Sequence, residues 1–139
     1  MTAEFDTALL WPAIAQAILI ALVYGLLGLV RQIAIRRGDV DSSDFPPGNE
    51  PPASAALRRH LANQFELPVL FYAALTFLTI TGAVSTFATI VAWLYVAFRA
   101  LHTWGALRGP LLLRHTAFTI AIFLVAILWL LLILKLIGR

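Results

Sequence analysis

Long apolar stretches separated by short polar segments run through the whole chain. A transmembrane helix requires about 20 mostly apolar residues, and four segments meet or nearly meet this requirement: 9–35, 54–82, 86–107 and 116–136. Ser85 or Thr86 is suited to cap the third of them. The pattern predicts an all-α integral membrane protein, with one domain built as a four-helix bundle.

The second segment differs from the other three because its apolar part extends only from Leu67 to Val84. Its helix is expected to begin near Ser54, directly after two prolines, and therefore to project beyond the bilayer. Pro68 removes a backbone donor and crowds the carbonyl four residues earlier, so it predicts a bend in this helix.

Residues 36–52 have the composition of an exposed loop. They contain four acidic residues and four prolines, which is too polar a mixture to bury a core. These residues are Asp39, Asp41, Asp44, Glu50, Pro46, Pro47, Pro51 and Pro52.

The distribution of charge predicts the orientation of the chain in the membrane. Glu4 and Asp6 precede the first apolar segment, whereas a cleaved signal peptide begins with positive charge, so we expect this segment to be retained. Four crossings place eight basic residues on one side, against Lys135 and Arg139 on the other. Because the excess of Lys and Arg remains cytoplasmic, both termini are predicted to be non-cytoplasmic. The eight residues are Arg31, Arg36, Arg37, Arg58, Arg59, Arg99, Arg108 and Arg114.

Composition excludes several classes of protein. Of the 139 residues, 61% are hydrophobic and 12% are charged, whereas soluble domains are about 45–50% apolar and about 25% charged. The net charge is +3, and no run of Lys or Arg is longer than two residues, so membrane topology explains the charge better than nucleic acid binding does. We therefore expect membrane lipids and no nucleic acid among the partners. Because the chain has no cysteine, any thiol chemistry must use a thiol brought by a ligand.

Polar residues inside membrane helices are costly and often mark functional sites. At about 100° per residue, Arg59, Asn63 and Glu66 fall within one narrow sector of a continuous helix. This polar stripe has two interpretations. It can hold helices together, or it can bind a polar ligand through a guanidinium, an amide and a carboxylate.

The third segment contains a second polar pair, Arg99 and His102, at positions i and i+3. Glu66 is the one acidic residue within the four predicted membrane segments, so an ion pair between Glu66 and Arg99 is the leading structural interpretation. The functional alternative is that Arg99, with Arg114 or Arg31, holds an anion such as a thiolate or a carboxylate.

Other kinds of chemistry receive little support. The three histidines lack the spacing of metal ligands, so no metal site is expected. No acidic residue except Glu66 lies near His102, which argues against a Ser/His/Asp arrangement. The chain also has no Gly-rich phosphate-binding loop.

Taken in combination, these motifs resemble those of the MAPEG family, the membrane-associated proteins of eicosanoid and glutathione metabolism. The resemblance is carried by Arg59, Asn63, Glu66 and Pro68 in the second of four helices. The stretches from Asn63 to Tyr72 and from Arg99 to His102, followed by Arg114-His115, are similar to an uncharacterised bacterial branch.

The resemblance implies a homotrimer in a bacterial inner membrane, with glutathione bound between protomers near the cytoplasmic face. It assigns glutathione contacts to Arg31, Arg59, Asn63, Glu66 and His102. It also implies that Arg114 or Arg99 stabilises the glutathione thiolate, which is reasonable because a nearby guanidinium lowers the pKa of a thiol.

Two functions remain open from the sequence. The first is a glutathione-dependent transferase or peroxidase that acts on lipophilic electrophiles entering from the bilayer. The second is a non-catalytic membrane protein of the same fold, either structural or binding a lipid or another small ligand. The chain carries His102 and Ala106 where the eukaryotic glutathione-using members carry two tyrosines, and this difference keeps the second function in consideration.

Overall fold

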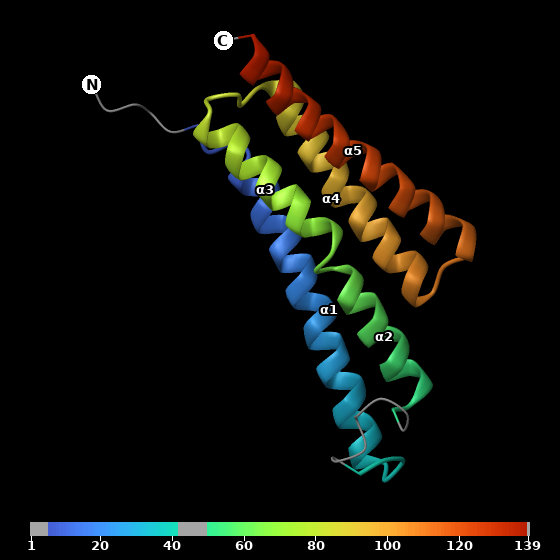
Figure 1. The fold of residues 1–139 in the computed structure, drawn as a ribbon. Coiled ribbons are helices and arrows are strands. Elements are labelled where there is room, and N and C mark those ends of the chain that lie inside the picture. Colours follow the sequence, from blue (N-terminus) through green and yellow to red (C-terminus); the bar gives the residue numbers. More distant parts are fainter. Residues whose placement is uncertain (1–5, 42–49, 139) are drawn as a thin grey trace.

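The computed structural model describes residues 6–41 and 50–138, and it is all-helical over these residues (Figure 1). Four stretches are long and apolar enough to cross a membrane, so the chain is a multi-pass membrane protein with a four-helix bundle fold. The second stretch is divided into two helices. The helices are α1 (Leu10–Arg36), α2 (Pro52–Asn63), α3 (Leu67–Ile80), α4 (Thr86–Leu107) and α5 (Leu111–Ile137).

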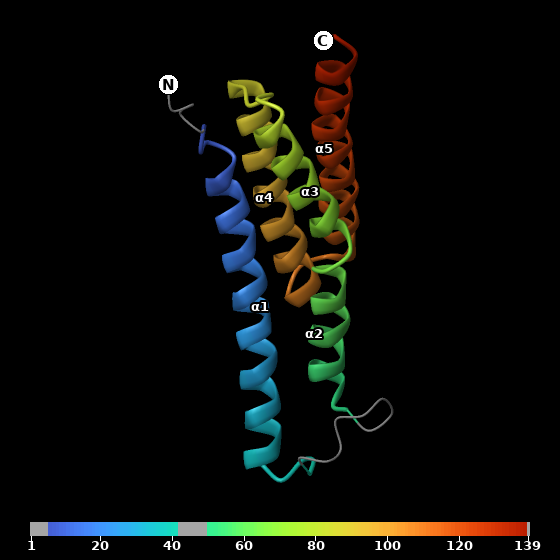
Figure 2. The same ribbon diagram turned by 60° about the vertical axis from the view of Figure 1, so that its left-hand side comes forward.

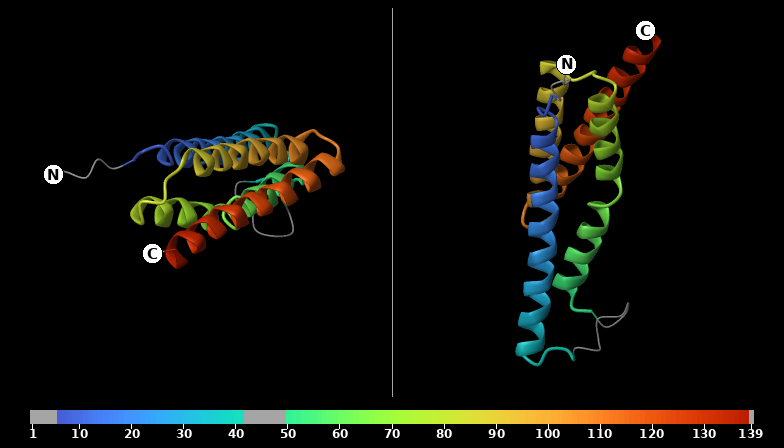
Figure 3. Two further views of the ribbon diagram at one scale, coloured as in Figure 1. Left: turned by 90° about the horizontal axis from the view of Figure 1, so that it is seen from above. Right: turned by 90° about the vertical axis from the view of Figure 1, so that its left-hand side faces the viewer.

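The helices form two layers, one of α1 and α4 and one of α2, α3 and α5 (Figure 3). The N-terminal end of α1 and the C-terminal end of α5 lie at the same end of the bundle, as four crossings require (Figure 1). At the opposite end, the C-terminus of α1 and the N-terminus of α2 extend past the turn between α4 and α5 (Figure 2).

Three of the four predicted segments correspond to single helices. The segment 86–107 has the observed bounds of α4, and 9–35 differs from α1 by one residue at each end. The segment 116–136 begins too late, because α5 starts at Leu111 directly after Pro110. Of the predicted loop 36–52, residues 42–49 lie outside the described residues.

The second predicted helix, 54–82, is broken rather than only bent. Residues 64–66 form a turn, and Pro68 lies in the first turn of α3. Pro68 has no N–H to donate, and a helix tolerates this at its start, where the first N–H groups have no intrahelical acceptor. The proline therefore favours a new helix after the turn.

Two helices end on glycines with positive φ, a conformation that costs glycine little. Gly82 follows α3 with φ +62, and the N–H of Ala83 donates to the carbonyl of Leu78 at 2.8 Å. Gly38 follows α1 with φ +73. At the other end of the α3–α4 connection, Ser85 Oγ accepts from the Ala88 N–H at 3.1 Å, so the predicted N-cap is Ser85.

The buried apolar side chains form two clusters. The larger one joins α3, α4 and α5 and includes Leu9, just before α1; the smaller one consists of Val23, Leu27, Leu57 and Leu61, between α1 and α2. Gln16 is buried on α1, between the part of this helix that packs on the larger cluster and the part that packs on the smaller one. Most of the remaining large apolar side chains are exposed, as expected for surfaces that face lipid.

Helices α4 and α5 approach each other most closely near their shared turn. A Cβ atom added to Gly105 would lie 2.9 Å from the backbone nitrogen of Arg114 and 3.0 Å from its Cα. No side chain fits between these two backbones. Gly105 therefore fixes the distance between α4 and the first turns of α5, where Arg114 and His115 lie.

Candidate functional site

The break between α2 and α3 lies beside a buried polar network. Its members come from three of the four spans and are almost fully buried, although the surrounding side chains are apolar. Buried polar groups are costly unless they are hydrogen-bonded, so such a network is a candidate site. The members are Gln16, His60, Gln64, Arg99, His102 and Thr103.

Gln64 is the centre of this network. Its Oε1 accepts from Arg99 Nη2 at 2.6 Å and from Gln16 Nε2 at 3.3 Å. Its Nε2 donates to Thr103 Oγ1 at 3.0 Å and lies 3.2 Å from His60 Nε2. Because a guanidinium can only donate, the contact with Arg99 fixes the orientation of the amide.

Arg99 is fully buried, yet its guanidinium is only partly satisfied. Nη2 donates to Gln64 Oε1 and, at 3.1 Å, to the carbonyl of Asn63, which the break leaves accessible. Nε and Nη1 have no hydrogen-bond partner in the part of the chain that the structure describes. No carboxylate of the described residues forms an ion pair with Arg99.

His102 connects the network to α5. Its Nδ1 lies 3.0 Å from the carbonyl of Arg114, which can only accept, so Nδ1 carries the proton. Its Nε2 is buried and has no hydrogen-bond partner among the described residues. The His102 ring lies between two others, 5.2 Å from His60 and 5.4 Å from Phe118 between ring centroids.

A cavity of about 230 Å³ lies next to this network. Its lining contains three basic side chains and no acidic one, so the cavity suits an anionic group. Two of its lining residues belong to or contact the network: His102 is a member, and Asn63 gives its carbonyl to Arg99. The lining residues are Asn63, His102, Arg114, His115 and Phe118.

The structure brings some of the predicted site residues together and separates others. Asn63, His102 and Arg114 line the one cavity, and Arg99 lies behind it. Arg59 and Glu66 are instead exposed on the protomer surface. The predicted stripe assumed a continuous helix, and the break at 64–66 removes that assumption.

The predicted ion pair between Glu66 and Arg99 is not formed. Glu66 is the residue that precedes α3, and its side chain is exposed. Arg99 instead donates to the neutral Gln64. The break explains the difference, because it places Gln64, rather than Glu66, on the buried side of the second span.

Arg31 lies in a separate ionic cluster between α1 and α2. Its Nη2 donates to Glu50 Oε1 at 2.6 Å, and Arg58 Nε donates to Glu50 Oε2 at 2.7 Å. The Ser54 hydroxyl also donates to Glu50. The Glu50 side chain is only 2% exposed, against 30% for Arg31 and 45% for Arg58.

These donors determine the charge of Glu50. Burial alone would raise the pKa of its carboxyl, but the hydrogen bonds from Ser54, Arg31 and Arg58 outweigh burial and lower the pKa to about 2. Glu50 is therefore an anion at neutral pH. The two arginines also border a cavity of about 260 Å³ with Tyr24, Leu27, Gly28 and Leu61.

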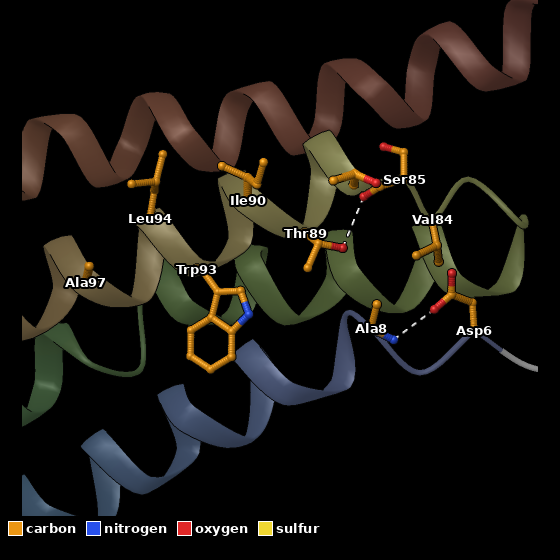
Figure 4. A pocket seen from close by; sticks show the side chains of 10 residues that line it. Asp6, Ala8, Val84, Ser85, Thr89, Ile90, Trp93, Leu94 and Ala97 are labelled. Atoms are coloured by element: carbon orange, nitrogen blue, oxygen red, sulfur yellow. Dashed lines mark hydrogen bonds between the residues drawn. The ribbon is translucent and has the colours of Figure 1, made fainter.

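Another cavity, of about 730 Å³, lies at the opposite end of α4 and contains none of the predicted site residues (Figure 4). It lies between α4 and the segment before α1, and its lining is mainly aliphatic and hydroxyl-bearing. Asp6 is its one charged residue, and Asp6 Oδ1 accepts from the Ala8 N–H at 2.9 Å. This lining does not suit an anion.

Four network members were not among the predicted site residues: Gln16, His60, Gln64 and Thr103. A signal exists for three of them, because His60 and Gln64, like Arg99 and Thr103, are polar residues four apart in predicted helices and so share a helix face. No group of three or more metal-ligand residues occurs within 6–41 and 50–138.

Comparison with known protein families identifies one match. The sequence model of the MAPEG family matches residues 8–134, nearly the whole chain. No curated protein and no solved structure matches the chain significantly.

Proposed function

The chain belongs to the MAPEG family, and on this premise we propose that it binds glutathione and uses its thiol on lipophilic electrophiles, as a transferase or a peroxidase. One observation carries the proposal: an acid-free, basic cavity borders a buried arginine that has no carboxylate partner. Glutathione has two carboxylates and a thiol. Such a ligand would supply the negative charge that this part of the chain lacks.

Each lining residue has a role in this proposal. The Arg114 guanidinium would stabilise the thiolate, and the positive charge of Arg99 would add to the field behind the cavity wall. Asn63 and His102 would hold polar groups of the tripeptide. Bound glutathione would supply the nucleophilic sulfur that forms a thioether with an electrophile, and the chain has no cysteine to compete with it.

The proposed site is completed by a neighbouring protomer. A cavity of about 230 Å³ is smaller than the roughly 300–1,000 Å³ of typical ligand pockets. Arg59 and Glu66 are exposed on the protomer, where a second copy can place them against a shared ligand. We therefore propose a homotrimer, and its mass after correction for bound detergent is the measurement that tests it.

The binding experiment uses the purified protein in detergent. Glutathione is expected to raise the Tm and to produce a thiolate absorbance band. Arg114→Ala should weaken binding about tenfold through the loss of a charge-assisted contact. Arg108→Ala is the matched control, because Arg108 is exposed on the same turn and does not line the cavity. Equal binding by both variants would contradict the assignment of the cavity.

Turnover separates the two functions that the sequence left open. A chloronitrobenzene and an organic hydroperoxide are suitable electrophiles for the assay. Thioether formation or peroxide reduction, lost in Arg114→Ala, is expected of the enzyme. Glutathione binding with neither reaction would instead support the non-catalytic binding protein, which His102 and Ala106, in place of two tyrosines, favour.

A further inference from the structure

The strongest unexplained feature of the molecule is a buried arginine that forms no ion pair among the described residues. Arg99 is fully buried, the exposed Glu66 acts on it only at longer range, and its Nε and Nη1 have no hydrogen-bond partner within residues 6–41 and 50–138. Burying an uncompensated charge is expensive, and proteins usually pair it with a carboxylate. In this chain the side chain of the second span that accepts from the Arg99 guanidinium is the neutral amide of Gln64.

Gln64 holds this guanidinium without neutralising it. All four hydrogen-bonding positions of the amide are engaged, by Arg99 and Gln16 at Oε1 and by Thr103 and His60 at Nε2. These partners come from α1, α2 and α4, so the amide is fixed from three sides. A glutamate at this position would fill the same volume and neutralise Arg99.

The charge lies one layer behind the basic cavity. Arg99 donates to the carbonyl of Asn63, and Asn63 lines the cavity together with His102, Arg114 and His115. Other charged or titratable groups that face this region are His60 on α2, Arg114 and His115 on α5, and the exposed Glu66 at the break. In a low-dielectric interior a charge acts more strongly on a nearby anion than it does in water.

We propose that Gln64 is a positioning residue that keeps Arg99 as an uncompensated cation, so that a thiolate or carboxylate of the ligand in the adjacent cavity becomes its counter-charge. This inference deepens the proposed function and rests on it for the identity of the ligand. It assigns a reason for a neutral amide, rather than an acid, at the break of the second span.

The decisive variant is Gln64→Glu, measured beside Gln32→Glu, which makes the same change on an exposed residue of α1. Gln64→Glu should fold with a Tm close to that of the wild type, because the ion pair that Arg99 gains offsets the hydrogen bonds from the amide nitrogen to Thr103 and His60 that are lost. It should nevertheless bind glutathione about tenfold more weakly. The pH midpoint of the thiolate band should rise by about one unit. Gln32→Glu should change none of these quantities.

A second probe tests the positioning role without glutathione. Sodium bromide should raise the Tm of the wild type relative to sodium gluconate at equal ionic strength, because the small anion can enter the cavity in front of Arg99 and act on its charge from there. The stabilisation should be lost in Gln64→Glu and in Arg99→Gln. If Gln64→Glu does not fold, the comparison of Arg99→Gln with the wild type decides the question.

The two probes distinguish the possible failures. If bromide stabilises only proteins with the native pair and glutathione does not bind, the glutathione proposal fails and the role of Gln64 stands. If bromide gives no stabilisation, or stabilises Arg99→Gln equally, the positioning role is overturned. Glutathione binding by Gln64→Glu with wild-type affinity and midpoint would overturn it as well.

Discussion

Glu50, just before α2, links two membrane helices through the hydrogen bonds that its side chain accepts. It receives hydrogen bonds from Arg31 of α1 and from Ser54 and Arg58 of α2. Exposed ion pairs contribute little to stability, but this carboxylate is almost completely buried. Removal of its charge would leave the two guanidinium groups without their shared acceptor.

The charge of Glu50 predicts a specific dependence of stability on pH. Its pKa is lowered in the folded protein from 4.5 to about 2, so its contribution is fully present above the ordinary value. The contribution is lost as the pH falls from 4.5 toward 2. Glu50→Gln should lower the free energy of unfolding by about 1–2 kcal/mol at pH 7.

Thermal unfolding in detergent at several pH values tests this prediction. The difference in Tm between the wild type and Glu50→Gln should shrink as the pH approaches 3. Glu66→Gln is the control, because Glu66 is exposed and forms no ion pair among the described residues. A difference that persists unchanged at low pH would show that the charge of Glu50 is not its source.

Part of the candidate site could be predicted from single residues. Arginine and histidine in an apolar segment are costly wherever they point, so Arg99 and His102 were identifiable from their types and positions. Arg114 lies between two predicted segments, and its role was implied by the family resemblance. Gln64 was not identifiable, because a glutamine costs less than a charge and its importance comes from four partners on three helices. Three of those partners, Gln16, Arg99 and Thr103, are distant in sequence, and only the fold brings them to Gln64.

At the level of elements, the contact between α4 and α5 depends on a small residue. The backbones approach so closely at Gly105 that a Cβ atom would meet the backbone of Arg114. A backbone cannot move aside as a flexible side chain can, so the whole start of α5 must shift. This contact sets the position of Arg114 relative to His102, whose Nδ1 donates to the Arg114 carbonyl.

Gly105→Ala is therefore expected to destabilise the protein by about 1–3 kcal/mol through overpacking and to weaken glutathione binding. Gly25→Ala is the matched control, because a Cβ atom on Gly25 meets nothing within 4 Å. That variant should be neutral or stabilising by about 0.5–1 kcal/mol, owing to better helix propensity. Equal Tm values for the two variants would mean that the close approach does not limit stability.

The spans could be predicted from the sequence, whereas the break could not be located. Hydropathy fixes which stretches cross the bilayer, because each must be apolar over a sufficient length. Pro68 is compatible with a kink, a bend or a new helix start, and these outcomes differ in which side chains face inward. The structure has a new helix start, and this places Gln64, rather than Glu66, on the buried side of the second span.

At the scale of the whole molecule, the fold places both polar clusters toward the end where α1 meets α2 and α4 meets α5 (Figure 1). The excess of Lys and Arg toward this end predicts that it faces the cytoplasm. The proposed ligand site would then open toward the compartment where reduced thiols are maintained.

Cysteine labelling tests this orientation without interference, because the chain contains no cysteine. A membrane-impermeant maleimide should label Thr7→Cys in intact bacterial cells. Asp39→Cys should react only after the cells are permeabilised. Both positions are exposed in the protomer, so access across the membrane is the variable that the experiment measures, and the reverse pattern would invert the predicted topology.

The divided second span also affects how the protein can respond to its surroundings. Helix α2 packs mainly on α1 and α3 mainly on α5, and only residues 64–66 connect them. A rigid rod meets a thicker or thinner bilayer by tilting as a whole. Here the two halves of the span can differ in tilt, because α2 follows α1 and α3 follows α5, while Gln64 holds the break between them to α1 and α4.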